Sequence, residues 1–254
     1  MPNWCTQRLK IEMLGERNTS REVEILQSLL NDEGDFDFNK IIPMPKELND
    51  TESSSRNILA LQYYVNTMLR RTPTEEPDPE FRSKVEIVKV ILFRTDPLVM
   101  NHQQFSDLMA NIGDSSLPEY FVLGEKCFNN LIKYGHMNWY TWRNANWGVK
   151  WNAANTTIVG DNSTHTAMFD TAWLPARPVI DELAEQYPEC RIILDFAEEQ
   201  VSEFAGHYEW ENGEIVMEEL YDSGSIECYE MAFELGVADR DNYELVGDTY
   251  RYKG

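Results

Sequence analysis

The chain has 254 residues and a formal net charge of −22 at pH 7. This length allows one elaborated domain whose core needs neither disulfides nor a structural metal. Such a strong negative charge repels phosphate backbones and anionic lipids, and the sequence has no basic cluster longer than Leu69-Arg70-Arg71, which excludes direct binding to nucleic acid or to a membrane surface.

The N-terminal third predicts one strand, one helix and an extended connection. Loosely alternating apolar residues from Trp4 to Met13 are typical of a strand. A helix is predicted over 20–31, because Asn18-Thr19-Ser20 offers an N-cap and the following valine and leucines recur at helical spacing. Alternation at 36–38 predicts a short strand, and the prolines of 41–45 predict an extended segment.

The middle of the chain, 49–119, predicts a mostly helical insertion interrupted by prolines. Apolar residues recur on one face over 56–71, and further helices are predicted over 81–93, 101–111 and 119–134. Gly135 marks the end of the last of these helices, because glycine is the residue most often found just past a helix C-terminus.

The second half of the chain returns to strand-like patterns. We expect a hairpin of 151–159 and 164–170 around the polar turn 160–163, a helix over 175–187, and a strand over 191–196. A second hairpin pairs 204–210 with 215–220 around Asn212-Gly213, followed by a helix over 226–235 and a strand-like end over 243–252.

This order is compatible with a split βαβ arrangement and therefore with the α+β class. We expect a ferredoxin-like antiparallel sheet of four or more strands with the helices at 20–31 and 175–187 on one face. The chain would then be one elaborated domain with a core of 1–48 and 120–254 and the helical insertion at 49–119.

The four cysteines and the N-terminus indicate a reducing compartment. The cysteines are scattered without paired spacing, so we expect buried, reduced thiols and neither a metal nor a cofactor. The opening Met1-Pro2-Asn3-Trp4-Cys5 has no basic start and no apolar signal core, and no window reaches the roughly 20 apolar residues of a membrane helix. We expect a cytoplasmic protein of undetermined oligomeric state.

Four segments together resemble the YubB-type family: the start at 1–5, the stretch 36–45, the tryptophan-rich stretch 134–152, and the Phe-Asp-Thr-Ala-Trp-Leu-Pro of 169–175. This uncharacterised family has a ferredoxin-like domain and is carried by phages, plasmids and other bacterial mobile elements. The resemblance implies a fold and a habitat, and it implies no catalytic residues. The word ferredoxin-like describes topology only and implies no iron–sulfur cluster. Neither 49–119 nor the acidic tail belongs to the resemblance.

The tryptophan-rich stretch is the first candidate site. An aromatic-walled pocket with a few polar groups could bind a small molecule or a nucleotide, whereas the alternative is that these tryptophans are core residues with satisfied indole NH groups. The residues of this candidate ligand site are Tyr134, His136, Trp139, Trp142, Arg143, Asn146, Trp147, Lys150, Trp151 and Asp170.

Two shorter patterns have structural interpretations that we favour. Asp170 or Thr171 would cap the helix that follows, although Asp170 could instead anchor a ligand beside the tryptophans. His207, Glu209 and Glu211 alternate and would share one strand face. A solvated acidic face is the simpler interpretation of that face, and metal binding or proton transfer is the alternative.

The acidic tail is the second candidate site. Residues 195–254 hold 17 acidic and 3 basic residues. Their charge is either a solvated, highly soluble surface or a surface for a basic host protein, acting even as a nucleic-acid mimic. We expect a non-enzymatic accessory protein of a mobile element that presents Glu209, Glu211, Glu218 and Glu219 to such a partner. The alternative is a ligand-binding protein or enzyme that uses the tryptophan-rich pocket.

Overall fold

The computed structural model describes residues 3–16, 18–51, 53–70, 78–92, 98–160 and 165–254. The chain forms two compact units, which we call the sheet unit (Met1–Pro43 with Arg143–Gly254) and the helical unit (Met44–Trp142). The helical unit therefore extends beyond the predicted insertion of 49–119 at both ends. It begins inside the proline-containing segment 41–45, at Met44, and it ends inside a helix that was not predicted from the sequence.

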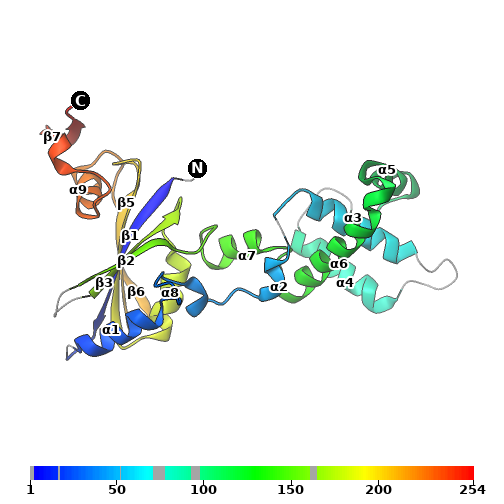
Figure 1. Ribbon diagram of the computed structural model, residues 1–254, viewed down its shortest axis with the longest axis horizontal. Helices are drawn as coiled ribbons and strands as arrows, with labels where there is room; N and C mark the ends of the chain where they lie inside the picture. The colour runs from blue at the N-terminus through cyan, green and yellow to red at the C-terminus, as the bar shows by residue number, and fades with distance from the viewer. Residues whose placement is uncertain (1–2, 17, 52, 71–77, 93–97, 161–164) are drawn as a thin grey trace. The chain divides into compact units, whose positions relative to one another are not determined.

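The sheet unit is built on the predicted split βαβ arrangement (Figure 1). Its first part is β1 (Trp4–Met13), α1 (Thr19–Ser28), β2 (Ala154–Gly160), β3 (His165–Ala172), α8 (Arg177–Gln186) and β4 (Cys190–Glu198). The hairpin β5 (Ala205–Glu211) and β6 (Glu214–Leu220) extends it, followed by α9 (Ile226–Glu234) and the hairpin β7 (Tyr243–Val246) and β8 (Thr249–Tyr252).

Within the described residues the main sheet has the order β2-β3-β1-β4-β5-β6, and every neighbouring pair is antiparallel. The first four strands in this order have the ferredoxin-like topology, which confirms the predicted fold class. Strand β1 lies in the middle, paired with β3 on one side and β4 on the other. Gln7 of β1 strengthens this position: its buried side chain donates to Thr171 Oγ1 at 2.5 Å and accepts from Ala176 N just before α8.

The main core lies between one face of the sheet and the helices α1 and α8, as predicted. Alternate residues of β1, among them Cys5, Leu9 and Ile11, are buried toward these helices. On α8 the buried stripe is Val179, Ile180, Leu183 and Ala184. We call the opposite side of the sheet the open face. Helix α9 packs on part of it, where Cys228, Met231 and Ala232 contact Ala197 and Ala205.

Two local predictions in the sheet unit are wrong. The segment 36–38 does not form a strand, because Phe36 makes only an isolated bridge and Asp37 caps a 3-10 turn at Phe38–Lys40 by accepting from Asn39 N. The C-terminal segment is not a single strand: it folds back at Gly247, whose φ of 66° suits a tight turn, into the β7–β8 hairpin. Most of the predicted turn at 160–163 lies outside the described residues.

The helical unit contains α2 (Lys46–Asn49), α3 (Arg56–Arg70), α4 (Pro79–Leu92), α5 (His102–Ile112) and α6 (Leu117–Tyr134). Helix α7 (Trp139–Asn146) starts in this unit. The core of the unit is formed by Leu61, Tyr64, Val65, Val85, Val88, Leu98, Cys127, Phe128 and Leu131. Helices α3 and α6 approach so closely that a Cβ on Gly124 would lie 2.1 Å from Ala60 O and 2.6 Å from Tyr64 Cβ.

Within the described residues no helix is long and apolar enough to cross a membrane. All four cysteines are buried, as predicted. Burial raises the pKa of Cys127 to about 12 and the pKa of Cys190 and Cys228 each to about 11, and it also raises the pKa of Cys5. At neutral pH these groups are therefore thiols, and thiols are poor nucleophiles.

We expect Gly124→Ala to lower the free energy of unfolding by about 1–3 kcal/mol, because the added methyl overpacks the α3–α6 contact. This loss should appear although alanine favours a helix by about 1 kcal/mol over glycine. Urea denaturation followed by circular dichroism measures it. The control is Glu125→Ala on the neighbouring exposed position, which should stay within about 0.5 kcal/mol of wild type. An unchanged Gly124→Ala variant would contradict the close packing.

We expect iodoacetamide to label the native cysteines very slowly at neutral pH, because the reagent needs an accessible thiolate. After denaturation without reductant, all four should react. Intact mass spectrometry counts the added groups. Rapid labelling of the native protein would contradict the burial described for these thiols.

Candidate functional site

The register of the three central strands places a row of charged side chains across the open face. Arg8 of β1 pairs with Asp195 of β4, and Asp195 pairs with His207 of β5. Their chain neighbours Leu9, Leu194 and Tyr208 are buried on the opposite side, because successive side chains of a strand alternate between faces. The predicted common face of His207, Glu209 and Glu211 is therefore confirmed by the structure.

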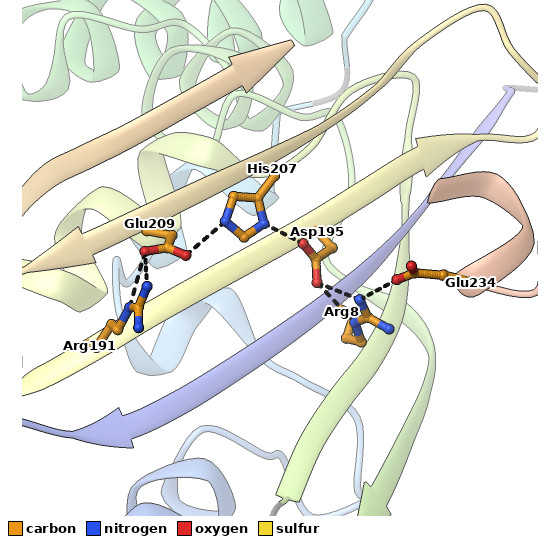
Figure 2. Close-up of polar contacts among 6 residues, drawn as sticks. All are labelled: Arg8, Arg191, Asp195, His207, Glu209 and Glu234. Atoms are coloured by element: carbon orange, nitrogen blue, oxygen red, sulfur yellow. Dashed lines mark hydrogen bonds and ion pairs between the residues drawn. The ribbon is translucent and has the colours of Figure 1, made fainter. Parts of the chain in front are cut away.

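These side chains form a continuous ionic network (Figure 2). Arg8 donates to Asp195 Oδ2 from Nε at 2.9 Å and from Nη2 at 2.7 Å, and its Nη2 also contacts Glu234 of α9 at 3.2 Å. His207 Nδ1 lies 2.6 Å from Asp195 Oδ1, and His207 Nε2 lies 2.9 Å from Glu209 Oε1. Arg191 closes the series by donating to Glu209.

The electrostatics of this network favour a charged imidazole. Burial lowers the pKa of His207, but its hydrogen bonds and charge contacts with Asp195 and Glu209 outweigh burial, so the pKa lies above its usual range. For Glu209 burial raises the pKa, but Arg191 and His207 outweigh it and hold the pKa below its usual range. Because both ring nitrogens face carboxylates, only the doubly protonated ring can donate to both.

The chemical consequence is a structural role for the network. A general base needs a free lone pair within reach of a substrate proton, and both nitrogens of His207 are engaged inside the protein. The side chains of His207 and Glu209 are only 19% and 11% exposed, so the expected solvated acidic face is wrong for these two residues. The alternating charges instead join β1, β4 and β5, and Arg8 joins them to α9.

A shallow groove of about 590 Å³ opens on the same face beside this network. Its walls are Arg8, Lys10, Val159, Thr166, Met168, Ile193, Asp195 and Glu234. Its charged groups are neutralised in part, since Arg8 contacts both Asp195 and Glu234 of the groove and Lys10 contacts Glu12 outside it. Within the described residues there is no group of three or more histidine, cysteine, aspartate or glutamate side chains that could hold a metal ion.

The structure does not place the four predicted partner-binding glutamates on one surface. Glu209 is buried in the network, and Glu211 lies 3.5 Å from Arg191. Glu218 points to the helix side of the sheet, where it accepts from Arg177 of α8 at 2.6 Å. Glu219 alone of the four is an exposed carboxylate of the open face, because it lies opposite His207. The proposed acidic face therefore needs a different set of residues.

Glu219 and three further carboxylates act electrostatically on Tyr221, just after β6. Burial raises the pKa of Tyr221, and the charges of Glu219, Asp195, Glu234 and Glu227 raise it further. These four carboxylates come from β4, β6 and α9, and we call them the acidic cluster. This convergence was not predicted from the sequence. The sequence shows only the charge excess of the whole tail, which does not indicate which of its acidic residues lie close together.

The predicted tryptophan-rich site is divided between the two units. Tyr134, His136, Trp139 and Trp142 belong to the helical unit, where Trp142 is buried and burial lowers the pKa of His136. The helix that carries Trp139 and Trp142 is capped by Asn138, whose Oδ1 accepts from Thr141 N at 3.0 Å.

The remaining residues of that site belong to the sheet unit. Trp147 is fully buried, its Nε1 donates to Ile42 O at 3.0 Å, and its ring packs edge-on against Phe38. The core interpretation is therefore correct for Trp147. Arg143 lies over the Trp147 ring at 4.9 Å, and Lys150 lies over the Trp151 ring at 4.4 Å. Asn146 ends α7.

The predicted capping role of Asp170 and Thr171 is wrong. Asp170 lies within β3 and accepts from Thr6 Oγ1 and Asn155 Nδ2, each at 2.8 Å. Thr171 bonds to Gln7 and donates to Leu174 O. Helix α8 starts after Ala176 without a side-chain cap, and its second residue, Pro178, has no N–H to satisfy.

We expect the free energy of unfolding to decrease as pH rises through the pKa of His207. Folding raises this pKa above its ordinary value of 6.5, so the stabilisation is complete below that value and is lost at higher pH. His207→Gln should remove this alkaline loss. Urea denaturation across a pH series measures the slope, and NMR titration of the ring protons measures the pKa.

His136 serves as an internal reference for this titration, because burial lowers its pKa and it should titrate below His207. A separate loss of stability is expected in acid, as pH falls through the depressed pKa of Glu209. An alkaline slope that His207→Gln leaves unchanged would show that another group causes it.

Comparison with known proteins gives one match to a family model and one similar structure. Residues 146–240, which run from the end of α7 into the 3-10 turn after α9, match the model described as the ferredoxin-like domain in Api92-like protein. The crystal structure of protein api92 from Yersinia pseudotuberculosis is 15% identical, with a TM-score of 0.41, and the alignment covers 89% of this chain and 100% of that one. No curated protein matches the chain.

Proposed function

We propose that this protein is a non-enzymatic interaction protein that binds a basic partner through the acidic cluster. In this proposal the chain is an accessory protein of a mobile element of the YubB-type kind, and the partner is a basic protein of the host. A nucleic-acid-binding protein is the partner class that suits this surface, because its lysines and arginines would meet carboxylates where they otherwise meet phosphates.

The observation that carries the proposal is the convergence of Asp195, Glu219, Glu227 and Glu234 around Tyr221. Like charges that act on the same group also repel one another, so this arrangement opposes folding. Arg8 compensates Asp195 and Glu234. Among the described residues, neither Glu219 nor Glu227 has an ion-pair partner within 4.0 Å. Their negative potential is available to a partner.

Further acidic residues near the acidic cluster add to its negative charge. Burial raises the pKa of Cys228 on α9 and the charge of Glu203 raises it further, so Glu203 lies near the same end of the sheet unit. Asp222 follows Tyr221 directly and is exposed. Charge complementarity of this kind accelerates association and selects partners more than it adds affinity.

The alternative function, a ligand-binding protein or enzyme with a tryptophan-rich pocket, has weaker support. Trp147 fills the core and its indole N–H is satisfied, so it is not available to form the wall of a pocket. The side chain that looks most catalytic, His207, has both nitrogens engaged. The interaction function needs neither group.

We expect the triple variant Glu203→Lys, Glu219→Lys and Glu227→Lys to bind an immobilised lysine-rich polypeptide about tenfold more weakly than wild type at low salt. Wild-type binding should itself weaken as ionic strength rises above about 0.1 M, where charges are screened beyond about 10 Å. Biolayer interferometry measures both effects. Glu209 is left unchanged, because a lysine there would stand buried beside Arg191.

The matched control is Glu33→Lys, Glu185→Lys and Glu189→Lys, which changes three exposed glutamates of the same unit and alters the net charge equally. The control should bind like wild type. Equal losses in both triple variants would show that only the overall charge matters, and the acidic cluster would then have no specific role. Circular dichroism checks that both variants fold.

A further inference from the structure

Strand β6 is an edge strand of the main sheet, and its residues are unusually exposed to solvent. It pairs with β5 on one side only, and all seven of its residues, Glu214–Leu220, are exposed. Four of them are apolar, and the exposed fractions of Val216 and Leu220 are 55% and 54%. Natural edge strands are usually blunted by lysine, proline or a covering segment, because unpaired backbone groups invite another strand. Strand β6 contains neither lysine nor proline.

The outward backbone groups of β6 can be assigned from its pairing. Tyr221 N donates to Ala205 O, so the backbone of Tyr221 points toward β5. Because backbone groups alternate in direction along an antiparallel strand, Glu218 and Leu220 point their N–H and C=O groups away from β5. Among the described strands, β5 is the only partner of β6, so this outer edge has room for one more strand.

The opposite edge of the sheet differs in two respects, although the register shifts at both edges, between Ala154 and Thr157 of β2 and between Glu209 and Trp210 of β5. Strand β2 carries no charged side chain. The segment before the 3-10 turn contacts it, since Phe36 N donates to Thr156 Oγ1 at 2.9 Å. Strand β6 instead carries three glutamates, Glu214, Glu218 and Glu219. Of the two described edges of the main sheet, β6 therefore combines an uncovered edge with a charge that selects its occupant.

The charge excludes a second copy of this chain as the favoured occupant. Two copies would bring together two edges with three glutamates each, on molecules that each carry a net charge of −22. A basic segment is instead attracted by the glutamates of this edge. On the open face, Glu219 belongs to the acidic cluster, and on the helix face Leu220 offers apolar contact.

We propose that the outer edge of β6 binds an extended segment of a basic partner protein as an added strand, with alternating basic and apolar side chains. Main-chain hydrogen bonds to Glu218 and Leu220 supply affinity, and the alternating side chains supply selectivity. Basic residues of the segment lie on the open face toward Glu219, and its apolar residues lie toward Leu220. This inference rests on the proposed function and specifies how the partner docks.

The test uses the whole protein and two synthetic peptides of alternating valine and lysine. One peptide is unmodified, and the other is N-methylated at alternate residues, which preserves its charge but blocks strand pairing. We expect the unmodified peptide to bind about tenfold more tightly, and we expect the amides of Glu218 and Leu220 to become about tenfold more protected from hydrogen exchange. Calorimetry measures the affinities, and NMR measures the exchange.

Protein variants provide the matched comparison. Leu220→Pro removes one outward N–H at a position where an edge strand tolerates proline, and it should abolish the preference for the unmodified peptide. Leu220→Ala keeps this N–H and should retain the preference. The N-methylated peptide leaves the protein unchanged, so the test remains decisive if Leu220→Pro does not fold.

Three outcomes would overturn the inference in distinguishable ways. Equal binding of both peptides without protection of the β6 amides would overturn edge pairing and leave the acidic cluster as the binding surface. Absence of binding by either peptide at low salt would overturn both this inference and the proposed function. A neutral peptide of alternating valine and serine that binds as tightly as the lysine peptide would overturn the choice of a basic occupant.

Discussion

The two-sided pairing of β1 is the constraint on which the rest of the sheet unit depends. This first strand lies between β3 and β4, and its register with both is continuous from Cys5 to Lys10. One face of β1 supplies the core under α1 and α8, and the other supplies Arg8 to the ionic network. Shifting β1 by one residue would exchange these faces, burying Arg8 and exposing Leu9, so the hydrophobic pattern fixes the position of every charge in the network.

The ionic network and the acidic cluster share residues but have different charge balance. Arg8 and Arg191 supply positive charge at the two ends of the network, and a protonated His207 supplies it in the middle, so its carboxylates are compensated. The acidic cluster begins where this compensation ends, at Glu219 and Glu227. The same sheet face therefore changes from internally paired charge at its centre to unpaired negative charge near α9. This gradient places the candidate interaction surface beside the edge strand β6.

Much of the fold was predictable from the sequence because its signals are local. The alternation in β1, the Asn212-Gly213 turn and the amphipathic stripe of α8 each specify an element with few neighbours involved. The errors arose where tertiary contacts decide. Asp170 was expected to cap a helix, but Thr6 and Asn155 extend hydrogen bonds to it within the sheet. Phe36 and Phe38 were expected in a strand, but they turn inward to pack against Phe169.

The candidate site was less predictable because it is assembled from distant segments. The pairing of Arg8 with Asp195 joins residues 187 positions apart, and charge counting gives no indication of such a pair. The tail was correctly recognised as acidic, yet Arg177 and Arg191 neutralise part of its charge by pairing with Glu218, Glu209 and Glu211. Which glutamates remain available depends on the register of β5 and β6, and that register is known only once the strands are paired.

The central position of β1 also has a consequence for synthesis on the ribosome. Strand β1 emerges before the helical unit, but its partners β3 and β4 emerge only after the whole helical unit, since Gln7 and Thr171 are 164 residues apart. Pairing over such separations is slow, because a long loop must close before any contact forms. The helical unit is continuous in sequence from Met44 to Trp142, and its contacts are available as soon as it emerges. The helices of the helical unit therefore pack before the sheet is complete. During this interval the apolar residues of β1 have no strand partners, because β3 and β4 have not yet been translated.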